Sequence, residues 1–451
     1  MSKFKILVLL AILFAVGLAI LFTPAAANGK DGDMPVVLAL KERAAVMNRW
    51  LKIRMEKVLP QIMRRENIDM WVVICQEHNE EPVYSTLVPK PNMFAWRLSM
   101  LIFNDLGETG VERISINPFG SGKFRSEMND FYTLAQVPDI ADPWEKLAGI
   151  IRDRNPQRIG INESDTFAFA DGLTASLKRK LVQALGPELS SRLVSAERLA
   201  VGWLEKRIPE EIETYSQINA ITHAIIAEFF SRKVITPGVT TLDDLTWWTR
   251  EKFAELKLGT WFQPIFYVLR PQNSVLKDSQ VIHFGDLLRC DVGVTYLGLN
   301  SDIQESAYVL RPNEEDVPQG LKEAFKKGNR LQDILTSEFI EKRTGNEVLA
   351  AAVQKAKAEG LKPLIYSHPL GYHGHAAGPR IGFSDMQGGV PGIGDYPLFY
   401  DTVYAIELNV RATIPEWGKQ EVTIALEEDA VFTSHGIYYL DGRQTKFHLI
   451  K

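Results

Sequence analysis

Four acidic residues stand in otherwise apolar, strand-like segments of this 451-residue chain, and they constrain its fold more than any other feature. Asp291 ends the apolar run 287–290, Asp302 follows eleven residues later, and Glu407 and Glu427 stand in two further apolar runs. One acid in such a run usually lies on a solvated face. Four in one region would carry buried charge that needs compensation. The chain must therefore bring a counter-charge to these carboxylates.

The spacing of the two aspartates indicates a divalent-metal site. Two strands joined by the glycine-containing turn between Asp291 and Asp302 would place both carboxylates side by side. Like charges so arranged repel and raise a pKa, and a divalent ion removes that penalty. Four carboxylates carry roughly −4 and two divalent ions roughly +4, so a dinuclear site is close to neutral. Mostly oxygen ligands with one imidazole suit Mn, Co, Zn or Fe.

The histidines are the expected source of that imidazole. The chain has eight, and His368, His373 and His375 fall within eight residues of one another, among glycines. A lone histidine is more often structural, but this clustering indicates a metal-ligand loop.

The N-terminus predicts export. Lys3 and Lys5 precede an apolar run over residues 6–22, and three alanines end at Ala27. This pattern is typical of a secretory signal, residues 1–27, cleaved after Ala27. We therefore expect a periplasmic or secreted protein with no stable membrane insertion after cleavage. The alternative is an uncleaved N-terminal membrane anchor, for which the run has the minimum length.

Composition argues against one class of partner. The net charge of −5 gives no reason to expect a nucleic-acid partner, because such proteins usually carry a basic surface. Only two cysteines are present, Cys75 and Cys290, both in apolar runs, so we expect two free core thiols.

Alternation of helical and strand patterns divides the chain into two domains. Residues 38–67 and 172–186 have helical periodicity, with strand-like runs between them, which predicts an α/β domain over residues 35–200. Pro209 and the two acids after it signal a helix start. Two long helices and then a strand-rich segment follow, so we expect an α+β domain over residues 201–451.

The order of the candidate ligands resembles the pita-bread metallopeptidase superfamily, which includes aminopeptidase P, prolidase and methionine aminopeptidase. Residues 291–302 match a motif similar to D-x-G-x-x-x-x-G-x-x-S-D, residues 374–378 match G-H-x-x-G, and Glu427 and Glu428 match a closing acid pair. The resemblance covers about residues 200–450. It implies a creatinase-like α/β N-terminal domain, a pita-bread α+β catalytic domain and a homodimer.

The resemblance also implies a ligand set and a reaction. The ligands would be Asp291, Asp302, His375, Glu407 and Glu427, holding two divalent ions, Mn first and Co or Zn also suitable. His373 is the alternative to His375, and His368 would be an additional loop histidine that steadies the transition state. The expected reaction is hydrolysis of Xaa-Pro peptide bonds by a hydroxide shared between the ions, with Glu407 taking its proton. Three aromatic residues could line a proline pocket or simply belong to the core: Tyr372, Phe383 and Trp417.

Two histidines of that family have no counterpart at the expected places. One stands about seventeen residues before the first aspartate ligand, where residues 270–274 have none. The other stands about seven residues after the histidine ligand, where residues 382–387 have none. Two alternatives therefore stay open beside the peptidase: a catalytically silent scaffold or binding protein, and a hydrolase of another small amide. A creatinase-like enzyme is disfavoured because those enzymes lack most of the ligands.

Overall fold

The computed structural model describes residues 34–92, 94–117, 127–135 and 142–451. Val37–Lys451 form one compact unit, so the domain boundary expected at residue 200 stays a prediction. The expected signal segment, residues 1–27, lies outside the described residues. Within the described ranges, every helix is too short or too polar to cross a bilayer.

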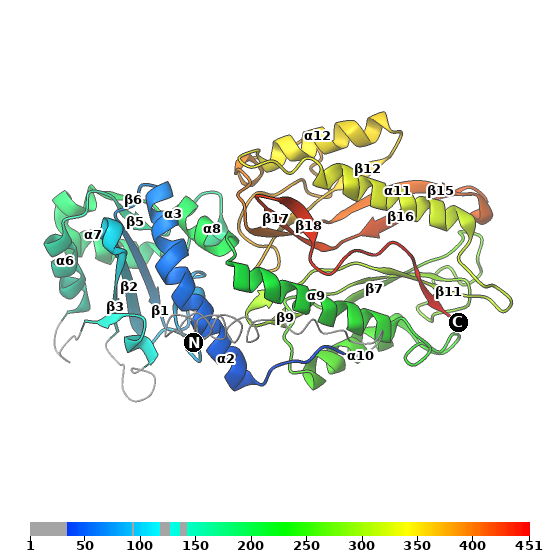
Figure 1. Cartoon of the computed structure of the whole chain (residues 1–451), viewed down its shortest axis with the longest axis horizontal. Helices are drawn as coiled ribbons and strands as arrows, with labels where there is room; N and C mark the ends of the chain where they lie inside the picture. The colour runs from blue at the N-terminus through cyan, green and yellow to red at the C-terminus, as the bar shows by residue number, and fades with distance from the viewer. Residues whose placement is uncertain (1–33, 93, 118–126, 136–141) are drawn as a thin grey trace, which may run out of the picture. The chain divides into compact units, whose positions relative to one another are not determined.

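The N-terminal region, Leu40–Glu205, is built on a six-stranded mixed sheet with helices on both faces (Figure 1). Its strand order is β4-β3-β2-β1-β5-β6, in which β1 runs antiparallel to β2 and parallel to β5. In chain order its main elements are α2 (Leu40–Ile53), the π-helical turn η1 (Arg54–Val58), α3 (Leu59–Arg65), β1 (Met70–Gln76), α4 (Tyr84–Leu87), β2 (Leu98–Asp105), β3 (Val111–Ile116), β4 (Thr133–Leu134), α6 (Pro143–Arg154), β5 (Ile159–Ile161), η3 (Ala168–Ala170), α7 (Ala175–Ser190), β6 (Leu193–Ser195) and α8 (Glu197–Glu205).

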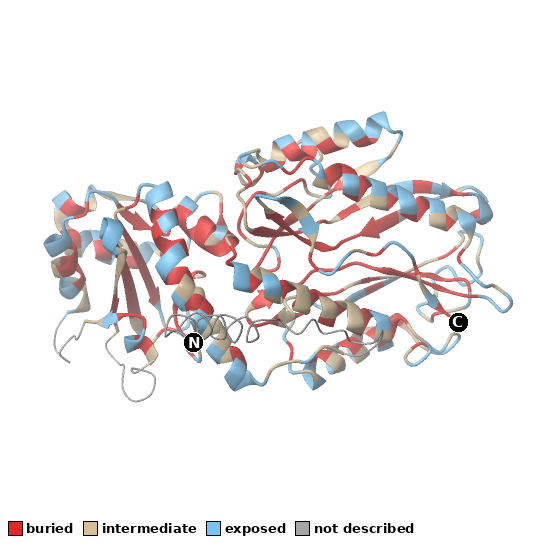
Figure 2. Cartoon of the chain, in the orientation of Figure 1, coloured by how far each residue is buried: buried red, intermediate tan, exposed pale blue. Residues whose placement is uncertain are grey.

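Both faces of the central strand β1 are buried. Met70, Val72 and Ile74 pack into one cluster with the apolar sides of α6 and α7. Trp71 and Val73 point to the opposite face and are just as inaccessible. Figure 2 accordingly shows the middle of this sheet in red. A strand buried on both faces requires a near-continuous apolar run, which is why the sequence pattern there predicts an α/β layer.

The C-terminal region, Pro209–Ile450, carries four long helices and several small sheets (Figure 1). Its main elements are α9 (Pro209–Phe229), α10 (Leu242–Glu255), β7 (Ile265–Leu269), β8 (Leu287–Asp291), β9 (Thr295–Tyr296), β10 (Leu299–Asn300), β11 (Ser306–Val309), α11 (Gln319–Thr336), α12 (Gly345–Ala358), β12 (Pro363–Ile365), β13 (His368–Leu370), β14 (Thr402–Ala405), β15 (Leu408–Ile414), β16 (Gln420–Leu426), β17 (Asp429–Thr433), β18 (Gly436–Tyr439) and β19 (His448–Ile450).

Three sheets of this region meet around the predicted site. Their strand orders are β19-β11-β8-β7, β12-β15-β16 and β13-β14-β17-β18, and β9 and β10 form a separate hairpin. Helix α11 packs on the three-stranded sheet through apolar side chains such as Leu321 and Phe325, which join Val410 and Ile424 in one buried cluster. This core holds the backs of the strands, so their polar ends are left to build the site.

Most of the elements expected from the sequence are present. The helical stretch 38–67 is α2, η1 and α3, and the run 172–186 lies within the range of α7 and the turn before it. The helix whose start Pro209 signals is α9, and it ends at Phe229 because Phe230 leaves the helical conformation (ψ 44°). Cys75 and Cys290 are both buried and free, as expected.

Candidate metal centre

The two aspartates lie on either side of a tight hairpin. Asp291 is the last residue of β8, and Asp302 comes two residues after β10. The hairpin between them turns through Leu297 (φ 54°) and Gly298 (φ 76°), the left-handed pair that a type I′ hairpin loop requires. A backbone bridge joins the residue that follows each aspartate. The chain is thereby closed so that both carboxylates reach the same place.

The two glutamates lie at junctions between strands, not inside them. Glu407 falls between β14 and β15, and Glu427 falls between β16 and β17. The expectation that both stand within single strands is wrong in this respect, since each apolar run spans two strands that belong to different sheets. At such a junction the backbone leaves one ladder and enters another, and the side chain there can point into the space between the sheets.

The four carboxylates come together at this meeting of sheets. One carboxylate oxygen from each of Asp291, Asp302 and Glu427 lies within 4.8 Å of the other two. A ring nitrogen of His368 and one oxygen each from Glu407 and Glu427 form a second group with the same spacing. Glu427 is thus common to both groups. Residues far apart in sequence therefore form one buried cluster of acids with an imidazole beside it.

Two polar partners that the sequence did not point to hold this cluster. The side-chain amide of Gln304 donates to Glu407 Oε1 at 2.8 Å and to Glu427 Oε2 at 2.7 Å. The carboxylate of Asp429 accepts the backbone N–H of Asp302 at 3.3 Å. Neither the side-chain amide of Gln304 nor the carboxylate of Asp429 belongs to the predicted ligand set, so only the tertiary structure identifies them as partners of the cluster.

His368 is the imidazole that faces the acids. It is fully buried on β13, and its Nε2 lies 3.4 Å from Asp302 Oδ2, 3.6 Å from Glu427 Oε1 and 3.8 Å from Glu407 Oε2. Its Nδ1 lies 3.0 Å from the carbonyl of Pro369, to which it can donate. That hydrogen bond fixes the tautomer that leaves the Nε2 lone pair directed toward the carboxylates.

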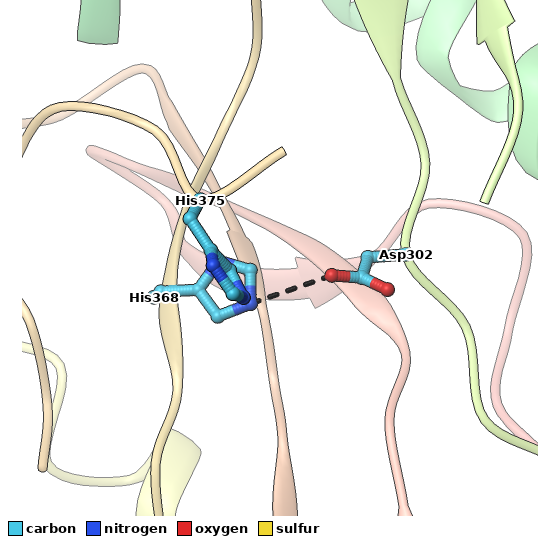
Figure 3. A group of neighbouring side chains, drawn as sticks. All are labelled: Asp302, His368 and His375. Carbon is cyan, nitrogen blue, oxygen red and sulfur yellow. Dashed lines mark ion pairs between the residues drawn. The ribbon is translucent and has the colours of Figure 1, made fainter. Parts of the chain in front are cut away.

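The other two loop histidines occupy different surroundings. His375 joins Asp302 and His368 in a third close group, with its ring centroid 4.6 Å from that of His368 (Figure 3). In Figure 3 His368 points across to Asp302, and His375 enters beside it from the adjoining loop. The ring of His373 instead stacks on Phe169 at 4.0 Å, and its Nδ1 is buried without a hydrogen-bond partner.

Burial and mutual repulsion make ionisation of this cluster costly. Burial, and then the charge of Glu427, raises the pKa of Asp291 to about 8 and raises the pKa of Asp302 and of Glu407 well above the usual range. Burial lowers the pKa of His368, so that ring is neutral. The site therefore has acids that resist losing their protons and an imidazole that supplies no positive charge.

A divalent cation fits these residues. Glu427 Oε1 and His368 Nε2 are both buried and have no hydrogen-bond partner, although each is a metal-ligand atom. Buried polar atoms are nearly always paired, so these two call for a partner that accepts electron pairs. Oxygen donors with a neutral imidazole are the ligand type preferred by Mn, Co and Zn ions.

A second cluster of acids and histidines nearby already contains its own cation. His223 lies 2.8 Å (Nδ1) from Asp441 and 3.0 Å (Nε2) from Glu428, while His448 pairs with Glu305 at 2.7 Å. Burial lowers the pKa of His223, but the hydrogen bonds to Asp441 and Glu428 outweigh this and raise it to about 11. The protonated ring therefore takes the place that a metal would otherwise fill.

We expect His223→Gln to destabilise the fold without touching the metal centre. Removing one partner of a largely buried pair leaves Glu428 uncompensated, at a cost of about 3 kcal/mol. Because the pKa of His223 is raised from 6.5 to about 11, its contribution is full below pH 6.5 and declines toward pH 11. Urea unfolding should therefore show a larger deficit at pH 6 than at pH 9. A deficit that is equal at both values, or equal to that of the exposed-turn control His435→Gln, would contradict this assignment.

The aromatic residues suggested for a proline pocket have other surroundings. Trp417 belongs to the buried core cluster, as the simpler interpretation holds. The Tyr372 hydroxyl donates to Glu211 at 3.0 Å, and Phe383 lies under the guanidinium of Arg380. The aromatic ring beside the site is Trp261, whose centroid lies 5.1 Å from that of His375. It lies between α10 and β7, in a stretch with no motif to single it out.

Solved structures with the same fold are numerous. An X-Pro aminopeptidase from Thermotoga maritima MSB8 superposes with a TM-score of 0.61 at 17% identity, covering 86% of this chain and 100% of the other. An Xaa-Pro dipeptidase from Bacillus anthracis gives 0.57 at 17% identity, covering 90% and 100%. The N-terminal domain of FACT complex subunit SPT16 from chickpea, Cicer arietinum, gives 0.53 at 11% identity, covering 90% and 99%. Identities this low establish the fold alone.

The sequence comparison goes further than the fold. A search of curated proteins finds no match to the chain. Residues 213–443, however, match the profile of metallopeptidase family M24, and this span is more than half of the chain. It contains all the acids and histidines of the candidate centre. With an α/β N-terminal region and a pita-bread C-terminal region, this chain belongs to metallopeptidase family M24.

Proposed function

We propose that this protein is a dinuclear-metal-dependent aminopeptidase that hydrolyses Xaa-Pro peptide bonds. The observation that carries the proposal is the buried cluster of four carboxylates around a neutral imidazole, with two ligand atoms left without a partner. The family supports a metallopeptidase, and solved structures of the same fold include an X-Pro aminopeptidase and an Xaa-Pro dipeptidase. Manganese is the first candidate ion, with cobalt and zinc as alternatives.

We assign the imidazole ligand to His368 and not to His375 or His373. His368 belongs to two of the three close groups at the centre, one of which also contains His375. Among the described residues it is the only one of the three rings within 4 Å of three carboxylates. With this assignment His375 stands seven residues after the ligand. That is the spacing at which the resemblance leads us to expect a second histidine, so under this assignment no histidine is expected within residues 382–387.

The remaining residues then have distinct tasks in the reaction. A pair of divalent ions, when bound, supplies a nucleophile at neutral pH and polarises the scissile carbonyl. Asp291, Asp302, His368, Glu407 and Glu427 would hold it. Glu407 also takes the proton of the attacking water, and Gln304 orients its carboxylate for this. His375, at the more open side of the centre, donates a hydrogen bond to the oxyanion as it forms.

The test is hydrolysis of short Xaa-Pro peptides by the purified protein with Mn²⁺, Co²⁺ or Zn²⁺ added in turn. We expect cleavage that depends on the metal and is lost in Asp302→Ala, whose carboxylate belongs to two of the close groups. The same peptide with alanine in place of proline tests the preference for the prolyl bond. Absence of cleavage with every ion, while the protein remains folded, would overturn the peptidase proposal.

One observation favours a second candidate. The N-terminal domain of a FACT complex subunit has the same fold, which means that this architecture also occurs in a protein named for its place in a complex. A folded protein that binds metal but cleaves neither Xaa-Pro nor other amide substrates would favour a scaffold or binding role. Cleavage of a non-peptide amide would favour a hydrolase of another small substrate.

A further inference from the structure

The loop that carries His375 is not part of any strand. His368 is fixed by β13, where it pairs with Ala405 of β14, but residues 371–378 have no ladder of their own. The position of the His375 ring therefore depends on the side-chain contacts that fix this loop. Two sets of these contacts involve residues of the N-terminal region.

The first set of contacts is a buried network of charged side chains that ends at Tyr372. Arg54, in the π-helical turn η1, donates through Nη1 to Glu211 Oε2 at 2.9 Å and to the carbonyl of Lys206 at 2.6 Å. The other oxygen of Glu211 accepts the hydroxyl of Tyr372 at 3.0 Å. Arg54, Glu211 and Arg207 all have side chains that are 0% exposed. π-helical turns are rare and often mark functional positions.

The arginines also hold the ring of Tyr372. The guanidinium of Arg207 lies 4.5 Å from the ring centroid and that of Arg54 lies 5.2 Å from it. Cation–π contacts of this kind strengthen when they are removed from water, as here. Tyr372 is thus fixed at both its hydroxyl and its ring, three residues before His375.

The second set of contacts is the stacking of an aromatic ring on His373. The Phe169 ring, in the short helix η3, lies parallel to the His373 ring with centroids 4.0 Å apart and planes at 20°. On the next residue, a Cβ built on Gly374 would lie 2.1 Å from the Trp261 ring, so that the indole presses on the loop backbone. The loop is therefore held at three successive residues immediately before His375.

We propose that Arg54 and Phe169, from the N-terminal region, are positioning residues for His375. The inference rests on the proposed function, in which His375 donates a hydrogen bond to the oxyanion. It gives the N-terminal region an indirect part in catalysis, through the position of His375. His373 is then an anchor of the loop and neither a ligand nor a catalytic group. Displacing a hydrogen-bond donor by a fraction of an ångström weakens its bond to the transition state more than substrate or metal binding.

The sharpest variant is Phe169→Leu, which keeps an apolar side chain but removes the stacked ring. We expect kcat on an Xaa-Pro peptide to fall about tenfold, while KM and the Mn²⁺ affinity change less than about twofold. Phe169→Tyr keeps the ring and should restore kcat. Tyr372→Phe, which removes only the hydroxyl contact with Glu211, should lower kcat in the same way. Arg54 itself is a poor first target, because its loss leaves a buried carboxylate uncompensated.

The matched control is Phe167→Leu. Phe167 lies two residues away and is more deeply buried, but its ring packs on Tyr396 and not on the loop. Its variant should lose stability without the selective fall in kcat. Equal kcat in wild type and Phe169→Leu, or an equal fall in Phe167→Leu, would overturn the inference.

A second measurement reads the position of the loop without any activity. Amide hydrogen exchange over residues 371–378 should be faster in Phe169→Leu than in wild type, while exchange over β13 stays unchanged. Phe167→Leu should not show this local change. If wild type cleaves no peptide, the proposed function fails, yet faster loop exchange in Phe169→Leu would still support the positioning role. Unchanged exchange there would overturn it independently.

Discussion

His368→Ala should abolish metal binding and peptidase activity together, whereas His375→Ala should keep the metal and lose turnover. The Nε2 atom of His368 faces three carboxylates and has no other partner. Removing it deletes one ligand, and the weaker metal binding then favours the ionised form of the carboxylates less. Because even the loss of an outer-sphere partner of a ligand lowers metal affinity by about 10–100-fold, loss of the ligand itself should exceed about 100-fold.

For His375→Ala we expect a different signature. Loss of one oxyanion donor typically lowers kcat by about 100- to 1,000-fold. The affinity for Mn²⁺ should stay within about threefold of wild type, because the residues assigned as ligands are intact. Calorimetric titration with Mn²⁺ and steady-state kinetics on one Xaa-Pro peptide separate the two effects.

The exposed histidine His435, in the turn between β17 and β18, provides the control, and His435→Ala should match wild type in both measurements. If instead His375→Ala loses the metal and His368→Ala retains it, the original expectation from the motif G-H-x-x-G is right. The assignment from geometry would then be wrong.

The acids of the site could be found from the sequence because each is a charged residue in an otherwise apolar stretch. Asp291, Asp302, Glu407 and Glu427 all stand next to apolar runs, and burial of such a residue demands compensation wherever the strands go. The same argument cannot say where a strand ends. Glu407 and Glu427 lie at junctions because the chain changes from one sheet to another, and the partner strands that decide this are distant in sequence.

The choice among the three histidines could not be made from the sequence for a related reason. His368 is followed by Pro369, which argues against a strand unless the strand is at an edge. Strand β13 is the edge strand of its sheet, so the proline is tolerated and His368 is held in a ladder with β14. Only that long-range pairing turns His368 toward the acids. The sequence pattern instead favours His375 as the ligand, because His375 stands among glycines in the motif G-H-x-x-G.

The α/β character of the N-terminal region was also predictable, because periodicity reports the local element. Its contribution to the site was not. Arg54 looks like an ordinary surface residue of an amphipathic helix, and its burial depends on Glu211, 157 residues away. Phe169 lies in a short helix with no pattern of its own. Contacts of this kind are properties of the assembled fold, which is why they carry information that motifs do not.

Removing the metal should make the stability of this protein fall as the pH rises from 5 to 8. Burial and the charge of Glu427 raise the pKa of Asp291 from 3.8 to about 8, and the pKa values of Asp302 and Glu407 shift in the same direction. Between the unfolded and folded values the native chain holds more protons than the unfolded chain. Stability must therefore decrease with pH across that window.

Bound metal should reverse this trend, because it favours the ionised carboxylates and releases their protons. Melting temperatures should be measured at pH 5, 6, 7 and 8 after chelation and again with saturating Mn²⁺. The difference between the melting temperatures with and without Mn²⁺ should widen as the pH rises. At a metal concentration about 1,000 times Kd, bound metal should raise the free energy of unfolding by about 4 kcal/mol. His223 contributes a decline of its own only above pH 6.5, but Glu205 and Glu81, which are not assigned as ligands, have pKa values that burial raises to about 8 and about 7. Their contribution is the same with and without metal, so the difference between the two curves isolates the metal centre.

Asp302→Asn gives the decisive comparison, because it removes one titrating buried carboxyl while keeping the shape of the side chain. Without metal this variant should be more stable than wild type at pH 8, and it should gain little from Mn²⁺. A variant that is more stable than wild type without metal but less stabilised by Mn²⁺ means that the clustered acids lower the stability of the metal-free fold and are stabilised by the bound ion. A chelated wild type whose melting temperature is level from pH 5 to 8 would mean that the cluster ionises without cost. The physical case for a metal centre would then be lost.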